Sequence, residues 1–170
     1  MLKDTLLYLA QNEQVRDFVT HNKATRGVSR RFVAGEDLDE AAQVTQTLNQ
    51  RNIQVALDLL GENVSDAAEA QNAARNYIAA LDCIQQNTLD ANISIKLTAL
   101  GLDISPELCE QSMRKILQRA RDLNIFVCID MEGSDYTERT VKMALLLQRD
   151  FPLVGTVIQS YLPRRSQRQG

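Results

Sequence analysis

The sequence predicts an α/β fold made of parallel βα repeats. Four short apolar segments have the length of strands, and helix-like patterns with short connections separate them. The segments are residues 54–60, 93–97, 125–130 and 154–159. Because strands joined through helices run parallel with right-handed crossovers, the alternation predicts a single parallel sheet. The strands are almost continuously apolar, which indicates burial on both faces of the sheet.

The expected helices have recognisable starts and apolar faces. The buried face of the first one is expected to consist of Ala70, Ala74, Tyr77, Leu81 and Ile84. Ser65 is its expected cap, and Ser134 is expected to open the helix before the last strand. Ser105 followed by Pro106 predicts a helix start between them, because proline is tolerated at the first helical position. The chain thus divides into a helical preamble, residues 1–52, and a βα region, residues 53–170.

Two architectures fit this alternation, an open doubly wound sheet and a (β/α)₈ barrel. No GxGxxG motif follows any of the strands, which weakens a dinucleotide-binding version of the open sheet. A whole barrel needs eight strands and about 250 residues. This chain has 170 residues and four expected strands. Both architectures stay open at this point, and four strands are too few for a closed barrel.

Composition excludes several classes of function. The chain is 44% hydrophobic and 24% charged, which is typical of a globular protein and gives no apolar run long enough to span a bilayer. A net charge of −3 and the absence of tryptophan argue against nucleic-acid binding. One histidine and three scattered cysteines form no metal-ligand pattern, so we expect no metal. The cysteines are expected to be free thiols in a reducing compartment.

Polar side chains stand at the ends of three of the apolar segments. Lys96, Asp130 and Gln159 lie far apart in sequence, yet the carboxyl ends of parallel strands meet at one edge of a sheet. Lys96 could hold a substrate carboxylate, with Asp130 on the neighbouring strand as its ion-pair partner. Asp58 is expected to have a structural hydrogen-bonding role, and Glu132 is expected to be solvated. A lysine and an aspartate in ordinary strand-end or capping roles remain the alternatives.

Five ordered blocks of the sequence resemble bacterial monofunctional proline dehydrogenases. They are RFVAGE (31–36), ALDLLGE (56–62), ISIKLTALGLD (93–103), IDME (129–132) and VIQSYL (157–162). The resemblance implies a distorted (β/α)₈ barrel that holds FAD and oxidises L-proline to 1-pyrroline-5-carboxylate, with electrons passed to a quinone. It implies that Lys96 contacts the proline carboxylate and that Asp130 is the catalytic aspartate. It also implies that Met131 and Gln159 contact the flavin.

The resemblance carries further expectations. The later blocks of the family are missing from this sequence, so the resemblance implies a partial, TIM-like (β/α)₈ barrel of about four strands. We expect such a truncated domain to have little activity by itself. The expected location is the cytoplasm. Peripheral contact with the inner membrane and assembly into a homo-oligomer are both left open. Two other hypotheses remain, namely a non-catalytic relic or interaction module with a half-barrel fold, and an unrelated doubly wound flavin-binding domain.

Overall fold

The structure is a computed structural model, and it describes residues 35, 37–61 and 63–159. The chain forms two compact units, residues 1–44 and 45–170, and helix α4 (Leu38–Asn49) runs across the boundary. Most of the expected preamble, residues 1–52, lies outside the described residues, so that domain division stays a prediction. The second unit contains the whole sheet.

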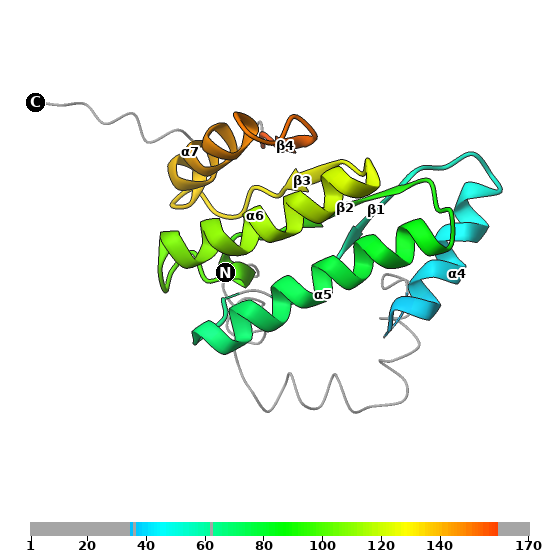
Figure 1. Ribbon diagram of the computed structural model, residues 1–170, viewed down its shortest axis with the longest axis horizontal. Coiled ribbons are helices and arrows are strands. Elements are labelled where there is room, and N and C mark those ends of the chain that lie inside the picture. Colours follow the sequence, from blue (N-terminus) through cyan, green and yellow to red (C-terminus); the bar gives the residue numbers. More distant parts are fainter. Residues whose placement is uncertain (1–34, 36, 62, 160–170) are drawn as a thin grey trace, which may run out of the picture. The chain divides into compact units, whose positions relative to one another are not determined.

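Strands and helices alternate in the second unit as the sequence predicts. The elements are β1 (Val55–Asp58), α5 (Ala67–Gln86), β2 (Ala91–Ile95), the 3₁₀ turn η1 (Thr98–Leu100), α6 (Pro106–Leu123), β3 (Val127–Ile129), α7 (Thr137–Gln148) and β4 (Val154–Thr156). Figure 1 shows α5, α6 and α7 following one another beside the strands. Three of the strands are shorter than the apolar segments that predicted them, whereas β2 has the predicted length and begins two residues earlier.

The sheet has the order β1-β2-β3-β4, and each neighbouring pair is parallel. A doubly wound sheet would reverse its strand order at a switch point, whereas this order is strictly sequential. The α/β fold class is therefore confirmed, with the connectivity of half a barrel. Within the described residues β1 and β4 are the edges of the sheet.

The two faces of the sheet differ in burial. Ile93, Ile95, Val127 and Ile129 are fully buried on one face, and Val154 is 2% exposed. Residues at the alternate positions, such as Ser94 and Cys128, are only partly buried. The expectation of burial on both faces is wrong for the described residues, because α5–α7 cover one face only and the other has no opposing strands among them.

The open face carries one aromatic contact. The ring of Phe126, 43% exposed, lies over Gly155 of the neighbouring strand, and a Cβ at Gly155 would come within 3.0 Å of that ring. The missing side chain at residue 155 lets the ring approach the strand closely. Asn92 points to the same side, and its buried Oδ1 has no hydrogen-bond partner among residues 35, 37–61 and 63–159. This face is therefore more polar than the face beneath the helices.

The helix starts agree with the sequence in one case and shift in two. Ser105 caps α6, since its Oγ accepts a bond from Leu108 N at 3.2 Å. The cap of α5 is Asp66 rather than Ser65, because the Asp66 carboxylate accepts from Glu69 N at 2.9 Å. Helix α7 begins at Thr137, three residues after Ser134. The expected buried face of α5 is confirmed in full.

The three thiols should react at different rates. Cys109 is fully buried, and burial raises its pKa to about 12, so its reactive thiolate is scarce at neutral pH. Cys128 is half-buried on the open face, where burial and then Asp130 raise its pKa. With a maleimide and peptide mass spectrometry we expect Cys128 to be labelled first and Cys109 last. Labelling of Cys109 as fast as Cys128 would contradict this packing.

Candidate functional site

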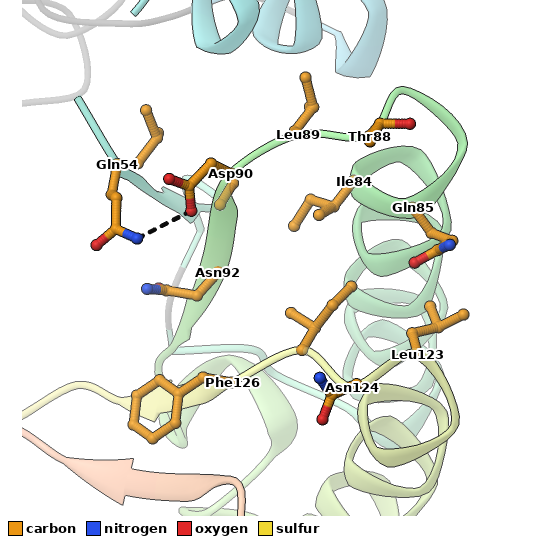
Figure 2. A pocket seen from close by; sticks show the side chains of 13 residues that line it. Gln54, Ile84, Gln85, Thr88, Leu89, Asp90, Asn92, Leu123, Asn124 and Phe126 are labelled. Atoms are coloured by element: carbon orange, nitrogen blue, oxygen red, sulfur yellow. Dashed lines mark hydrogen bonds between the residues drawn. The ribbon is translucent and has the colours of Figure 1, made fainter. Parts of the chain in front are cut away.

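Two hollows flank the sheet, and they lie at opposite ends of the strands. The one in Figure 2, about 660 Å³, lies at the amino ends, where Gln54 Nε2 donates to Asp90 Oδ1 at 3.0 Å. Asn92 and Phe126 line its sheet side, and α5 and α6 close the other side. Barrel enzymes place their chemistry at the carboxyl ends of strands and use the amino ends for stability. The carboxyl edge of the sheet is therefore the candidate functional site.

Lys96 lies at that carboxyl edge, directly after β2. Asp58 at the end of β1 is in register with Ser94, so Asp58 and Lys96 project from the same face of the sheet. Lys96 Nζ forms an ion pair with Asp58 Oδ2, and the two side chains are 16% and 34% exposed. The lysine stem thus lies largely out of solvent, with its cation held by a carboxylate.

Asp130 reaches the same edge from β3, as the sequence predicts, but its carboxylate has a different hydrogen bond. Its backbone N donates to Ile95 O at 2.9 Å, which places it beside the strand end that carries Lys96. Its Oδ1 accepts a bond from Met131 N at 2.8 Å. Lys96 pairs with Asp58 and Asp130 accepts from the next residue's amide, so the expected Lys96–Asp130 ion pair stays a prediction.

Met131 and Gln159 meet at the ends of β3 and β4. The Met131 side chain is 3% exposed, and Gln159 Nε2 donates to Met131 O at 2.8 Å. Val157 N also donates to Ile129 O, at 3.1 Å, so backbone pairing continues past the last strand. The four residues expected at the site, Lys96, Asp130, Met131 and Gln159, thus share one edge of the sheet. Their roles toward substrate and cofactor stay predictions.

Glu132 is half-buried rather than fully solvated, and the sequence analysis missed its partners. Thr98 donates to its carboxylate twice, through Oγ1 and, at 3.3 Å, through the backbone N. Thr98 is 2% exposed, and its Oγ1 accepts a bond from Asn63 N at 3.4 Å. The equal spacing of these residues along their segments is the sequence signal for this pairing. Thr98 follows Lys96 by two residues, just as Glu132 follows Asp130.

Tyr77 brings α5 to the same group of charges. Its side chain is 1% exposed, and its buried hydroxyl has no well-formed hydrogen bond among the described residues. Burial raises the pKa of Tyr77; the neighbouring Lys96 amide opposes that rise, and the carboxylates of Asp58, Glu132 and Asp130 add to it. These carboxylates therefore lie close enough to act on one hydroxyl. Tyr77 also lines a hollow of about 520 Å³ beyond β1, together with Gly61 and Ala99.

A second tie joins the segments that follow β2 and β3. Asp103 accepts from Tyr136 Oη at 2.7 Å and from Arg139 Nη1 at 2.8 Å, and Arg139 Nη2 also donates to Leu102 O. The Arg139 guanidinium lies 5.7 Å from the centre of the Tyr136 ring. The Tyr136 hydroxyl and then the guanidinium lower the pKa of Asp103. These bonds thus hold the segment after β2 against the start of α7.

In the part of the chain that the structure describes, no group of three or more His, Cys, Asp or Glu side chains is arranged to hold a metal ion. In the same part, no helix is long and apolar enough to cross a membrane. The site is therefore described by its lysine, its carboxylates and the amide of Gln159.

Comparison with protein families gives one match over most of the chain. The family model described as proline dehydrogenase matches residues 41–169. Proline dehydrogenase 1 of Bacillus subtilis (strain 168) is 35% identical over 167 residues, which cover 98% of this chain and 55% of that protein. Proline dehydrogenase of Deinococcus radiodurans is 30% identical over 169 residues, covering 96% of this chain and 54% of that protein. The chain spans about half the length of the curated relatives it matches.

Solved structures show a similar fold. Proline utilization A from Bdellovibrio bacteriovorus, inactivated by N-propargylglycine, superposes with a TM-score of 0.75 and 23% identity. The superposition covers 82% of this chain and 18% of that one. A mutant of the Bradyrhizobium japonicum protein gives a TM-score of 0.56 at 22% identity, covering 75% and 15%. At these identities the likeness concerns the fold, and it agrees with a partial TIM-like barrel.

Proposed function

This chain belongs to the proline dehydrogenase family, and we propose that it carries the proline-binding half of an enzyme that oxidises L-proline to 1-pyrroline-5-carboxylate. FAD is the proposed cofactor, and a quinone is the proposed electron acceptor. The proposed location is the cytoplasm, with peripheral contact to the inner membrane. Since the chain spans about half of its relatives' length, the activity belongs to the whole enzyme.

The observation that carries the proposal is the environment of Lys96. Its side chain is 16% exposed, and its cation is held at the carboxyl edge by Asp58. Proline is a zwitterion, with a carboxylate and a ring ammonium. Lys96 can take the carboxylate, because a charge-assisted hydrogen bond is stronger than a neutral one. The Asp58 or Asp130 carboxylate can then face the ring nitrogen and hold the substrate in one orientation.

The residues at the end of β3 and β4 fit the ring end of a flavin. Gln159 has an amide that can donate and accept, which suits the polar edge of a heterocycle. Met131 contributes a largely buried apolar side chain beside it. A bound flavin would supply the acceptor for the hydride that leaves the proline ring.

The activity test uses a chimaera in which this chain replaces the matching part of the Bacillus subtilis relative. The free chain with added FAD should show little proline-dependent dye reduction, because four strands supply only part of the shell around substrate and cofactor. The chimaera should reduce dye in the presence of proline. The native relative serves as the positive control for folding and for flavin loading.

Two outcomes would contradict the proposal. A chimaera that folds and binds flavin but shows no proline-dependent dye reduction would mean that this half does not carry the substrate site. Robust turnover by the free chain would mean that the site does not need the remaining half. Dye reduction, flavin absorbance and circular dichroism are measured on the same preparations.

A non-catalytic interaction module is the second candidate, and the apolar exposure at the carboxyl edge favours it. Leu60 and Ile158 are 79% and 82% exposed. Exposed apolar side chains near unpaired strand edges are typical of surfaces that bind another chain. Flavin absorbance separates the two candidates, since a module of this kind has no need to retain a flavin.

A further inference from the structure

A short hydrogen-bond chain links the segments that follow three neighbouring strands. Glu132 follows β3, Thr98 follows β2, and Asn63 follows β1. Thr98 Oγ1 and N both donate to the Glu132 carboxylate, and Asn63 N donates to Thr98 Oγ1 at 3.4 Å. We call these three residues the strand-end clamp. It spans the end of the sheet from which Lys96 and Asp130 project.

The clamp is well suited to hold its geometry. Thr98 is 2% exposed, so its hydroxyl and amide would each lose a hydrogen bond if Glu132 moved away. A buried polar group without a partner is costly, and a carboxylate is a strong acceptor for both donors at once. Using both carboxylate oxygens also fixes the orientation of the Glu132 side chain. The clamp is therefore a rigid connection rather than a single exposed contact.

The positions of the clamp residues relate it to the candidate site. Lys96 stands two residues before Thr98, and Asp130 stands two residues before Glu132. A shift of Thr98 relative to Glu132 would change the offset between the ends of β2 and β3. That offset sets the separation of the lysine cation from the Asp130 carboxylate, and displacements of about 1 Å can cost on the order of a hundredfold in rate.

We propose that Glu132 acts through Thr98 as a positioning residue, which holds Lys96 and Asp130 at the spacing that proline requires. The proposal rests on the proposed function for its substrate, whereas the clamp itself can be tested without any substrate. A tie that only stabilises the fold would change stability and leave the proline requirement unchanged. The two cases therefore differ in a measurable way.

The first measurement is amide hydrogen exchange on the free chain. In Glu132→Ala the Thr98 amide should exchange on the order of tenfold faster, because it loses its acceptor. The Asn63 amide should also exchange faster, because the Thr98 hydroxyl that accepts its bond is no longer held by Glu132. Amides within α5 and α6 should keep their rates, which shows that the protein remains folded. Glu138→Gln is the matched control, since Glu138 lies on α7 with a side chain 70% exposed and pairs with Lys142. Unchanged exchange at Asn63 and Thr98 would overturn the clamp.

The second measurement is a proline titration on the flavin-loaded chimaera. Glu132→Ala and Thr98→Val should raise the proline concentration for half-maximal rate by about tenfold or more, with flavin retention unchanged. Thr98→Ser keeps the hydroxyl and should restore nearly wild-type behaviour, as should Glu138→Gln. Faster exchange with a wild-type proline requirement would overturn the positioning role and leave a structural tie. If the unaltered chimaera did not respond to proline, the positioning role would fall with the proposed function, and the exchange result would still decide the clamp.

Discussion

Lys96→Met in the chimaera is expected to weaken proline binding by roughly ten- to a hundredfold while the flavin stays bound. Methionine keeps much of the length and apolar character of the lysine stem, and it removes the charge together with the N–H donors. A hydrogen bond to a charged group contributes about 1.5–3 kcal/mol, and each 1.4 kcal/mol is a factor of ten in affinity. The substitution should leave the flavin in place, because Gln159 and Met131 lie at other strand ends.

Three variants make the Lys96 result specific. Lys142→Met removes an exposed lysine that pairs with Glu138, and it should leave proline binding unchanged. Gln159→Ala should show the reverse pattern, with weaker flavin retention and little direct effect on proline, since a hydrogen bond contributes about 0.5–1.5 kcal/mol net. Asp58→Asn tests the ion-pair partner found in the structure. Wild-type proline affinity in Lys96→Met, or loss of its flavin, would show that the proposed roles are wrong.

The strand order could be predicted from the sequence, because it follows from apolar periodicity within short segments. Four apolar segments separated by helical patterns permit few topologies, and the buried face of α5 followed from its spacing alone. Ser105 and Pro106 marked the start of α6 correctly. The sequence does not decide a helix start where two neighbouring residues can both act as the N-cap. Ser65 and Asp66 can both cap, and the structure selects Asp66.

The partner of Lys96 could not be predicted in the same way. Periodicity gives the face and the end of the strand, but the choice among nearby carboxylates depends on side-chain rotamers and burial. Asp58, Asp130 and Glu132 all lie near the carboxyl edge and all act on the Tyr77 hydroxyl. Asp130 accepts from Met131 N, Glu132 accepts from Thr98, and Asp58 pairs with Lys96. The pattern of apolar residues in a strand does not say which of several nearby carboxylates pairs with the lysine.

The burial of the two sheet faces shows a second limit of sequence patterns. Apolar runs predicted burial on both sides, but Phe126 is exposed on the face that no described helix covers. A strand from the middle of a closed barrel has the same composition whether or not the opposing strands are present. Composition therefore reports the environment in which a strand functions, and the four described strands supply only part of that environment.

Leu147→Ala should destabilise the free chain by about 2–5 kcal/mol, whereas Leu145→Ala should change the free energy of unfolding by less than about 0.5 kcal/mol. Both leucines lie on α7, and the substitution is the same. Leu147 is fully buried and Leu145 is 58% exposed. The difference between the variants therefore measures burial alone, without a difference in helix propensity. Urea unfolding followed by circular dichroism gives the two values.

The same pair of variants connects packing to the site. Helix α7 leads into β4, and β4 positions Gln159 against the carbonyl of Met131. A loss of 2–5 kcal/mol is a large part of the ~5–15 kcal/mol that stabilises a typical domain, so Leu147→Ala should loosen β4 before it unfolds α5 and α6. Leu147→Met keeps the volume and should cost less than about 1.5 kcal/mol, which provides a folded reference. Equal effects of Leu145→Ala and Leu147→Ala would mean that α7 does not pack through Leu147, and the support for Gln159 at the carboxyl edge would then have to come from elsewhere.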